Sequence, residues 1–295
     1  MKSAALLHNP GAGDESHTKK QLKSMIEEEG FKCSYSSTKK KGWDEIPSDS
    51  EFIIIAGGDG TVRKVVKKFI ENDINKLPIA LFPAGTANNI AKTLDVSDVD
   101  EVVIRSWHKE RIKNFDVGRI SNLSSTHFFL ESFGYGVFPL LMKEMKNQDK
   151  KNSGTAEDEL NLAIRLLHTI IRSYEAPYCE LEIDGTDHSG KYLLVEIMNI
   201  QSIGPNLHLS PSSDPGDGEF EVVLIPDEQK DKFLSYVDNL IKGEDESFQF
   251  DIVKGKNIRI KCAELYCHAD DELIKEKKAS EIKIELADGL VKFLV

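Results

Sequence analysis

The stretch Ile53-Ile54-Ile55-Ala56-Gly57-Gly58-Asp59-Gly60-Thr61 decides the fold that we predict for this chain. Its apolar run ends abruptly in glycines, which indicates a buried strand that enters a phosphate-binding turn. Glycines let a backbone approach an anion and adopt positive φ, and a following helix presents its N-H groups to that anion. The next apolar residues have the i, i+3, i+4 spacing of one buried helical face: Val62, Val65, Val66, Phe69 and Ile70.

Asp59 is unexpected in such a turn, because a carboxylate repels phosphate. We therefore predict that Asp59 faces a magnesium ion that accompanies the nucleotide. The alternative is an ordinary strand-to-helix turn without a ligand, since a glycine-rich loop alone is a weak signal.

A second strand end has the same character. The buried run Pro78 to Phe82 leads into Pro83-Ala84-Gly85-Thr86-Ala87-Asn88-Asn89 and then into a helix from Ile90 to Leu94. Two such turns would lie at the carboxyl edge of one parallel sheet, which is where open α/β sheets bind ligands.

The N-terminal part of the chain alternates between strand and helix patterns. A strand from Ala4 to His8 is followed by a helix that Asp14 or Ser16 would cap and by a strand from Phe31 to Ser36. This alternation continues to a helix from Asp98 to Trp107 and predicts a mostly parallel sheet over residues 1–110.

From Arg111 onward short alternating runs dominate, which predicts an antiparallel β domain, most simply a sandwich, over residues 111–285. Two of these predicted strands are Glu281 to Glu285 and Leu290 to Leu294. An amphipathic helix from Ala156 to Tyr174 interrupts them. We favour its covering the sandwich over the alternative that its apolar face helps admit a lipid.

Composition limits the function classes. A chain of 295 residues with 40% hydrophobic and 30% charged residues suits two folded domains. Its net charge of -12 argues against a nucleic-acid partner and against strong electrostatic adhesion to an anionic membrane. The absence of an apolar stretch of about 20 residues or of a signal peptide predicts a cytoplasmic protein.

Cys33, Cys179, Cys262 and Cys267 are few and scattered, which fits a reducing compartment. Cys262, Cys267 and His268 lack a fourth ligand at a zinc-site spacing. We therefore expect buried thiols.

The motifs together resemble a known family. Gly57-Gly58-Asp59-Gly60-Thr61 and Gly85-Thr86-Ala87-Asn88-Asn89, preceded by Asn9-Pro10-Gly11-Ala12-Gly13, resemble the diacylglycerol kinase catalytic domain of bacterial lipid kinases, diacylglycerol kinases and sphingosine kinases. The resemblance implies a Rossmann-like parallel-sheet domain followed by an antiparallel β-sandwich, with residues from about 286 to 295 returning to the first domain. It also implies ATP and Mg²⁺ as cofactors, with the nucleotide in the cleft between the domains.

The same resemblance assigns site residues. Nucleotide contacts are expected from Asn9, Pro10, Gly11, Ala12, Gly13, Thr38, Gly57, Gly58, Asp59, Gly60, Thr61, Val62, Arg63 and Thr86, with Ser37 as an alternative to Thr38. In His268-Ala269-Asp270-Asp271-Glu272, Glu272 takes the role of catalytic base and Asp270 a supporting role, although the stretch alone also reads as a solvated turn. Asp271 stands where the family usually has glycine.

A loop from Pro211 to Glu219 resembles the family's structural magnesium site. Asp217 would supply a carboxylate, and Asp214 and Glu219 would supply backbone carbonyls. An Asx turn without an ion is the alternative. Asp116 is the acid that the family has at the start of the second domain.

Three functions remain open at this point. The first is an ATP-dependent lipid kinase that acts on diacylglycerol or a long-chain base, with transient contact at a membrane surface. The second is NAD kinase, which shares the Gly-Gly-Asp-Gly loop. The third is an inactive nucleotide-binding regulator, which Arg63-Lys64, Asn89 and Asp271 would suit because they depart from the family pattern. A homodimer is also left open.

Overall fold

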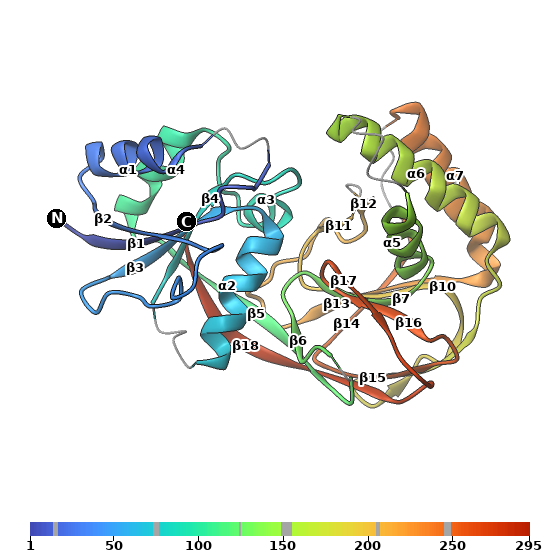
Figure 1. Cartoon of the computed structure of the whole chain (residues 1–295). Helices are drawn as coiled ribbons and strands as arrows, with labels where there is room; N and C mark the ends of the chain where they lie inside the picture. The colour runs from blue at the N-terminus through green and yellow to red at the C-terminus, as the bar shows by residue number, and fades with distance from the viewer. Residues whose placement is uncertain (14–16, 73–76, 124, 149–154, 205–206, 245–248) are drawn as a thin grey trace. The chain divides into compact units, whose positions relative to one another are not determined.

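The computed structural model describes residues 1–13, 17–72, 77–123, 125–148, 155–204, 207–244 and 249–295 (Figure 1). The chain forms two compact units. Unit 1 comprises Met1–Asp116 and Asp288–Val295, and unit 2 comprises Val117–Ala287. We predicted a boundary near Arg111 and a return near residue 286. The observed boundaries lie within two strands, β5 (Ile112–Ser121) and β18 (Ile282–Leu294), so no break in the hydrophobic pattern marks them.

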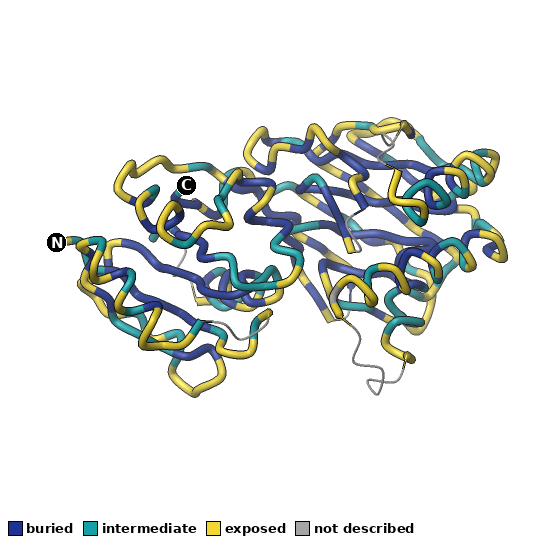
Figure 2. The backbone as a smooth tube through the Cα atoms, turned by 90° about the horizontal axis from the view of Figure 1, so that it is seen from above, coloured by how far each residue is buried: buried dark blue, intermediate teal, exposed yellow. Residues whose placement is uncertain are grey.

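Unit 1 is built on a parallel sheet, which confirms the predicted fold class (Figure 1). Its strand order is β2, β1, β3, β4 and the end of β18, and every neighbouring pair runs parallel. The strands are β1 (Ser3–His8), β2 (Lys32–Ser37), β3 (Phe52–Gly57) and β4 (Ile79–Pro83). All six residues of β3 are buried, as expected for a central strand of a covered parallel sheet. Figure 2 shows buried stretches of the backbone alternating with exposed turns.

The helices of unit 1 are α1 (Lys19–Glu28), α2 (Asp59–Glu71), α3 (Asn89–Thr93) and α4 (Asp100–Ser106), followed by the 3₁₀ turn η1 (Trp107–Lys109). The predicted caps Asp14 and Ser16 lie outside the described residues. The structure caps α1 with Thr18, whose hydroxyl accepts from the backbone N-H of Gln21 at 3.3 Å. The side chain of Gln21 accepts in return from the backbone N-H of Thr18 at 2.9 Å, which completes a capping box.

Unit 2 is an antiparallel β-sandwich, as predicted. One sheet has the order β17, β16, β7, β10, β13, β14, and the other contains β8, β9, β15, β5, β6 and the first part of β18. The two are joined at the start of β10, where Gly190 and Lys191 pair with β8. The bounds are β6 (Phe128–Phe129), β7 (Ser132–Gly136), β8 (Tyr178–Ile183), β9 (Thr186–Asp187), β10 (Gly190–Met198), β13 (Phe220–Pro226), β14 (Asp251–Gly255), β15 (Asn257–Cys262), β16 (Tyr266–Ala269) and β17 (Glu272–Lys275). A short pair, β11 (Ser202–Ile203) with β12 (Leu207–His208), stands apart.

Apolar side chains of both sheets fill the sandwich. Phe133 and Phe220 of one sheet are fully buried in one cluster that also contains Ile258 and Ile284 of the opposite sheet. The two predicted strands at 281–285 and 290–294 are a single strand, β18, which continues through Gly289 although that residue has a φ of 53°.

A helical layer covers the β10–β13 face of one sheet (Figure 1). It consists of α5 (Val137–Asn147), α6 (Ala156–Ser173) and α7 (Lys230–Lys242), which follows the 3₁₀ turn η2 (Asp227–Gln229). Leu167 of α6 and Val237 of α7 are fully buried in one cluster with Leu194 of β10 and Val223 of β13. The favoured interpretation of α6 as a cover of the sandwich is confirmed, whereas α5 was not predicted.

The cysteines require a correction. Cys33 and Cys267 are buried free thiols, as expected, but Cys179 and Cys262 form a disulfide. The register of β8 and β15 places these two residues directly opposite one another, with their Cα atoms 4.3 Å apart. A contact between residues so far apart in the chain cannot be read from cysteine spacing.

Membrane-spanning character is not found in the helices. None of those in the described part of the chain combines the length and the apolar composition needed to cross a bilayer.

Candidate functional site

The carboxyl edge of the unit 1 sheet gathers three of the predicted loops. The parallel strands end in register, so the backbone N-H of Asn9 donates to the carbonyl of Ala56 at 2.9 Å, and that of Ala84 donates to the carbonyl of Gly57 at 3.1 Å. The side-chain amide of Asn9 also donates to the hydroxyl of Thr61 at 3.0 Å. The loops that follow β1, β3 and β4 therefore form one contiguous surface.

Glycines are required where these loops pack against one another. A Cβ at Gly58 would lie 2.9 Å from the Cα of Gly85, and a Cβ at Gly85 would clash with the Cα of Gly58. Gly13 has a φ of 58°, and a Cβ there would lie 2.5 Å from the carbonyl oxygen of Ala84. We predicted glycine for close approach to phosphate, and the structure adds close approach of backbone to backbone.

Asp59 has a role that its sequence position did not reveal. Its carboxylate oxygens accept the backbone N-H groups of Asn89 at 2.9 Å and Ile90 at 3.0 Å, so Asp59 of α2 caps the N-terminus of α3. Burial raises the pKa of Asp59, and the two N-H donors oppose that rise. The carboxylate of Asp59 already caps α3, and its proposed position facing a magnesium ion stays a prediction.

The N-terminus of α2 is the expected anion site. Its N-cap residue is Gly58, which has no side chain to bond the first-turn N-H groups. Gly60 and Thr86 are exposed, while Asp59 turns to α3. Such a helix end carries unsatisfied N-H groups and a positive dipole, and both favour phosphate.

Thr38 lies at the same edge, after β2, and is buried. Its hydroxyl donates to the carbonyl of His8 at 3.3 Å, and its own carbonyl accepts from Nζ of Lys64 at 2.6 Å. Lys64 therefore connects α2 to the end of β2. Its Nζ also lies 5.3 Å from the centre of the Trp43 ring, which is within the range of a cation–π contact. Nucleotide contact by Thr38 stays a prediction.

Asp116 is fully buried, and its carboxylate accepts the backbone N-H of Gly289 at 2.7 Å. The bond joins β5 to β18 inside unit 1. Asp116 thus has a structural task of its own.

The predicted catalytic acids lie on the β16–β17 hairpin of unit 2. Asp270 has a φ of 53°, and its carboxylate accepts the backbone N-H groups of Leu130, Glu131 and Ser132 at distances between 2.7 and 3.2 Å. Asp271 does not adopt a positive φ, so this turn does not need the glycine that the family usually has there. Asp270 is an anchor of the turn, and a supporting role in catalysis stays a prediction.

Glu272 begins β17 and is half-buried. The hydroxyl of Thr126 donates to its carboxylate at 2.8 Å. Since Thr126 is itself buried, this bond holds the carboxylate in one orientation. A carboxylate held in this way and accessible to solvent suits a general base.

Sequence reasoning missed a buried pair beside this hairpin. Glu196 and His268 are both fully buried, and Nε2 of His268 lies 2.9 Å from a carboxylate oxygen of Glu196. The signal was present, because Glu196 is an acid within the apolar run Leu193 to Met198. Charged residues are almost never fully buried without a partner.

The ammonium group of Lys254, on β14, lies against the predicted magnesium loop. Oδ1 of Asp217 accepts the N-H of Glu219 at 3.0 Å, and Oδ2 lies 2.9 Å from Nζ of Lys254. The same Nζ lies 3.5 Å from Glu219 and 3.3 Å from the buried Glu221. The hydrogen bond that Lys254 donates to Asp217 is the largest cause that raises the pKa of Lys254.

The oxygen donors of this loop suit a hard cation. The carbonyl of Asp214 accepts the N-H of Asp217 at 3.1 Å, and Lys254 already offsets the carboxylate charge. Across the described ranges no group of three or more His, Cys, Asp or Glu side chains is arranged to hold a metal ion. The magnesium site formed by the carboxylate of Asp217 and the backbone carbonyls of Asp214 and Glu219 therefore stays a prediction.

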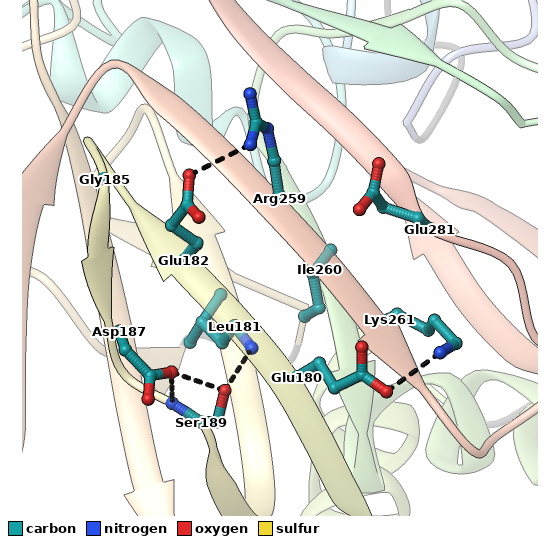
Figure 3. A pocket seen from close by; sticks show the side chains of 10 residues that line it. All are labelled: Glu180, Leu181, Glu182, Gly185, Asp187, Ser189, Arg259, Ile260, Lys261 and Glu281. Carbon is teal, nitrogen blue, oxygen red and sulfur yellow. Dashed lines mark hydrogen bonds and ion pairs between the residues drawn. The ribbon is translucent and has the colours of Figure 1, made fainter.

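A shallow pocket of about 300 Å³ on the β8–β15 sheet contains none of the predicted site residues (Figure 3). Its two cations are paired, since Lys261 lies 2.8 Å from Glu180 and Arg259 lies 3.3 Å from Glu182. We therefore assign the pocket no role.

Comparison with known proteins defines the class. The diacylglycerol kinase catalytic domain model matches residues 3–120, and the YegS C-terminal NAD kinase beta sandwich-like domain model matches residues 145–285. The first match covers the α/β part of the chain, and the second lies within the β-sandwich part. The chain belongs to the diacylglycerol kinase catalytic domain family, which confirms the family predicted from its motifs.

Individual relatives agree with this assignment. The chain is 24% identical over 303 residues to a diacylglycerol kinase of Bacillus subtilis, covering 98% of this chain and 88% of that protein. It is 22% identical over 234 residues to a diacylglycerol kinase of Mycobacterium tuberculosis, covering 77% and 72%. A crystal structure of a diacylglycerol kinase from Bacillus anthracis has the same fold, with a TM-score of 0.73, 21% identity and coverage of 99% and 96%.

Proposed function

We propose that the protein is an ATP-dependent lipid kinase that transfers the γ-phosphate of ATP to a hydroxyl of a lipid such as diacylglycerol or a long-chain base. The observation that carries the proposal is the gathering of the loops after β1, β3 and β4 at the open N-terminus of α2. Phosphoryl transfer needs positioning and charge compensation more than covalent help from the protein.

In this proposal the edge of unit 1 holds the nucleotide phosphates. The N-H groups at the start of α2 and the loop Asn9 to Gly13 orient them, with Thr61 fixed by Asn9 and Thr86 exposed beside them. Bound Mg²⁺ would offset the phosphate charge with Asp59 near it. A second, structural Mg²⁺ would be held by Asp217 and the carbonyls of Asp214 and Glu219.

Glu272 acts as the general base in this proposal. It takes the proton of the lipid hydroxyl as that oxygen forms a bond to the γ-phosphorus and the bond from this phosphorus to the bridging oxygen of ADP breaks. Thr126 orients the carboxylate of Glu272, and Asp270 holds the turn from which Glu272 extends.

The substrate implies the partner. Diacyl lipids reside in bilayers, so we propose transient contact of a cytoplasmic enzyme with a membrane surface. The net charge of -12 makes this contact weak in electrostatic terms. A homodimer is part of the same proposal, and sedimentation velocity tests it.

The decisive experiment measures transfer of labelled phosphate from ATP with Mg²⁺ to a panel of lipids and to NAD. Glu272→Gln keeps the shape of the side chain and removes its basicity, so kcat should fall by about 10²- to 10⁴-fold while the KM for ATP stays nearly unchanged. Glu285→Gln, which alters an exposed acid of β18, is the matched control.

Each other outcome has a definite meaning. Phosphorylation of NAD and of no lipid would replace the proposal with NAD kinase. ATP binding without transfer to any acceptor would indicate a regulator. Normal turnover by Glu272→Gln would remove Glu272 from the role of base.

A further inference from the structure

The buried pair of Glu196 and His268 has a geometry that the proposed reaction does not yet use. The two residues lie on β10 and β16, which flank the central strand β7. Both pair with the same residue of β7, Gly134. The pair therefore bridges over β7 at Gly134, a position where that strand carries no side chain.

Gly134 makes this bridge sterically feasible. A Cβ at position 134 would clash with Oε2 of Glu196. Side chains on neighbouring strands normally meet their direct partners, and a residue two strands away is reached only across an empty position. The pair is thus one reason for glycine at this position, and the backbone carbonyl oxygen of Val195, 2.8 Å from such a Cβ, is another.

The contacts of His268 determine its protonation. Nε2 faces the Glu196 carboxylate, at 2.9 Å from one oxygen and 3.1 Å from the other, and Nδ1 lies 3.0 Å from the backbone carbonyl of Asp270. A backbone carbonyl and a carboxylate both accept, so both ring nitrogens must donate. His268 is then an imidazolium whose charge Glu196 offsets, and the ring of Phe138 meets it edge-on with centres 4.8 Å apart.

The bond from His268 reaches the catalytic hairpin. The carbonyl that it fixes belongs to Asp270, whose carboxylate is anchored on Leu130, Glu131 and Ser132. Two residues later the strand presents Glu272. The turn is consequently fixed at two places. His268 bonds the carbonyl of Asp270, and the backbone N-H groups of residues 130–132 bond the Asp270 carboxylate.

We propose that Glu196 and His268 form a positioning pair that fixes the Asp270-Asp271 turn and thereby sets the direction of the Glu272 carboxylate. This inference rests on the proposed function of Glu272. A misplacement of about 1 Å at a reacting group can lower a rate about 100-fold. The bond from His268 to the turn before Glu272 therefore affects kcat although His268 does not touch the substrate.

Two substitutions separate the two bonds of the imidazolium. The amide nitrogen of His268→Asn lies near the position of Nδ1 and retains the bond to the Asp270 carbonyl. That of His268→Gln lies near Nε2 and retains the bond to Glu196. We expect His268→Gln to lower kcat by about 10- to 100-fold with the KM for ATP unchanged, and His268→Asn to lower stability more but kcat less.

The control for lost stability alone is Val237→Ala, which opens a fully buried site on α7. It should lower stability with kcat unchanged for the folded protein. If the kcat values of the two His268 variants follow their stabilities, or both equal the native value, the pair is only structural and the inference is overturned.

Two measurements keep the inference separate from the kinase proposal. Hydrogen exchange at residues 130–132 and 270–272 should be faster in His268→Gln than in His268→Asn whether or not any lipid is phosphorylated, and equal rates would overturn the inference. Nitrogen NMR of the native protein needs no variant. Protons on both ring nitrogens of His268 at pH 7 are expected, and a neutral ring would overturn it. Failure of lipid transfer by the native protein would instead count against the kinase proposal.

Discussion

Replacing Asp59 with alanine should lower the free energy of unfolding of unit 1 even in the absence of any nucleotide. The carboxylate accepts two backbone N-H groups, from Asn89 and Ile90, and both residues are buried. α3 has five residues, so the cap stabilises a large part of the helix. Loss of a helix cap costs about 0.5–2 kcal/mol, and a hydrogen bond to a charged group contributes about 1.5–3 kcal/mol. We expect a loss of about 2–4 kcal/mol, below the sum of the two bonds because water can enter.

Urea unfolding followed by tryptophan fluorescence is a suitable assay. Both tryptophans of the chain, Trp43 and Trp107, belong to unit 1, so the signal reports on the unit that contains Asp59. The control is Glu101→Ala, which removes an exposed acid from the first turn of α4 and should change the free energy by less than about 0.5 kcal/mol. An Asp59→Ala variant as stable as this control would refute the capping argument.

Asp59→Asn then separates capping from cation binding. The amide retains one acceptor oxygen, so stability should fall less than in the alanine variant. The negative charge is lost in both, and a magnesium-dependent stabilisation by ATP should weaken equally in both if Asp59 faces the ion. Equal magnesium dependence in the native protein and the asparagine variant would leave Asp59 with the capping role alone.

Three further perturbations test other contacts. Gly85→Ala would place a Cβ against the Cα of Gly58, so we expect a loss of about 1–3 kcal/mol in urea unfolding together with weaker ATP binding, and a variant that binds ATP normally would contradict tight loop packing. Lys254→Met removes the ammonium group beside Asp217, so the melting temperature should fall by the equivalent of about 1 kcal/mol and recover with Mg²⁺, whereas no recovery would count against a cation site in this loop. Burial is the largest single influence on the pKa of His268 and lowers it, but the charge and hydrogen bond of Glu196 and the contacts with Asp270 together outweigh burial, so the net pKa is raised. The stability that the charged ring contributes is therefore complete below the unfolded pKa and is lost as pH rises through the folded pKa. The stability difference between the native protein and His268→Asn should therefore shrink above about pH 6.5, and a constant difference would argue against a charged ring.

Local patterns predicted the elements well. The apolar run Ile53 to Ala56 is β3, and the helical spacing from Val62 to Phe69 is the buried face of α2. Helix and strand periods depend on neighbouring residues, so a single sequence contains them. α5 was missed because Val137 to Leu141 is a continuous apolar run directly after a strand, and such a run has no period to read.

The interactions that organise the candidate site were not predictable, because they join residues far apart in the chain. Asp59 meets Asn89, Asp270 meets Leu130, and Glu196 meets His268. The sequence indicated which residue types gather at strand ends, but not which of them bond to one another. The acids that looked available for a metal or a substrate therefore include several that hold backbone groups.

The course of β18 has a consequence for biosynthesis. Its residues Phe293 and Leu294 pair with β4 of unit 1, whereas residues 282–285 pair with β15 of unit 2. The ribosome makes all of unit 2 before it makes Phe293, a fully buried core residue that packs against Phe115. The first unit to be translated is thus the last to be completed, and until then β4 exposes an unpaired strand edge. Such edges invite pairing with other nascent chains, so a chaperone that shields β4 during translation would raise the yield of folded protein.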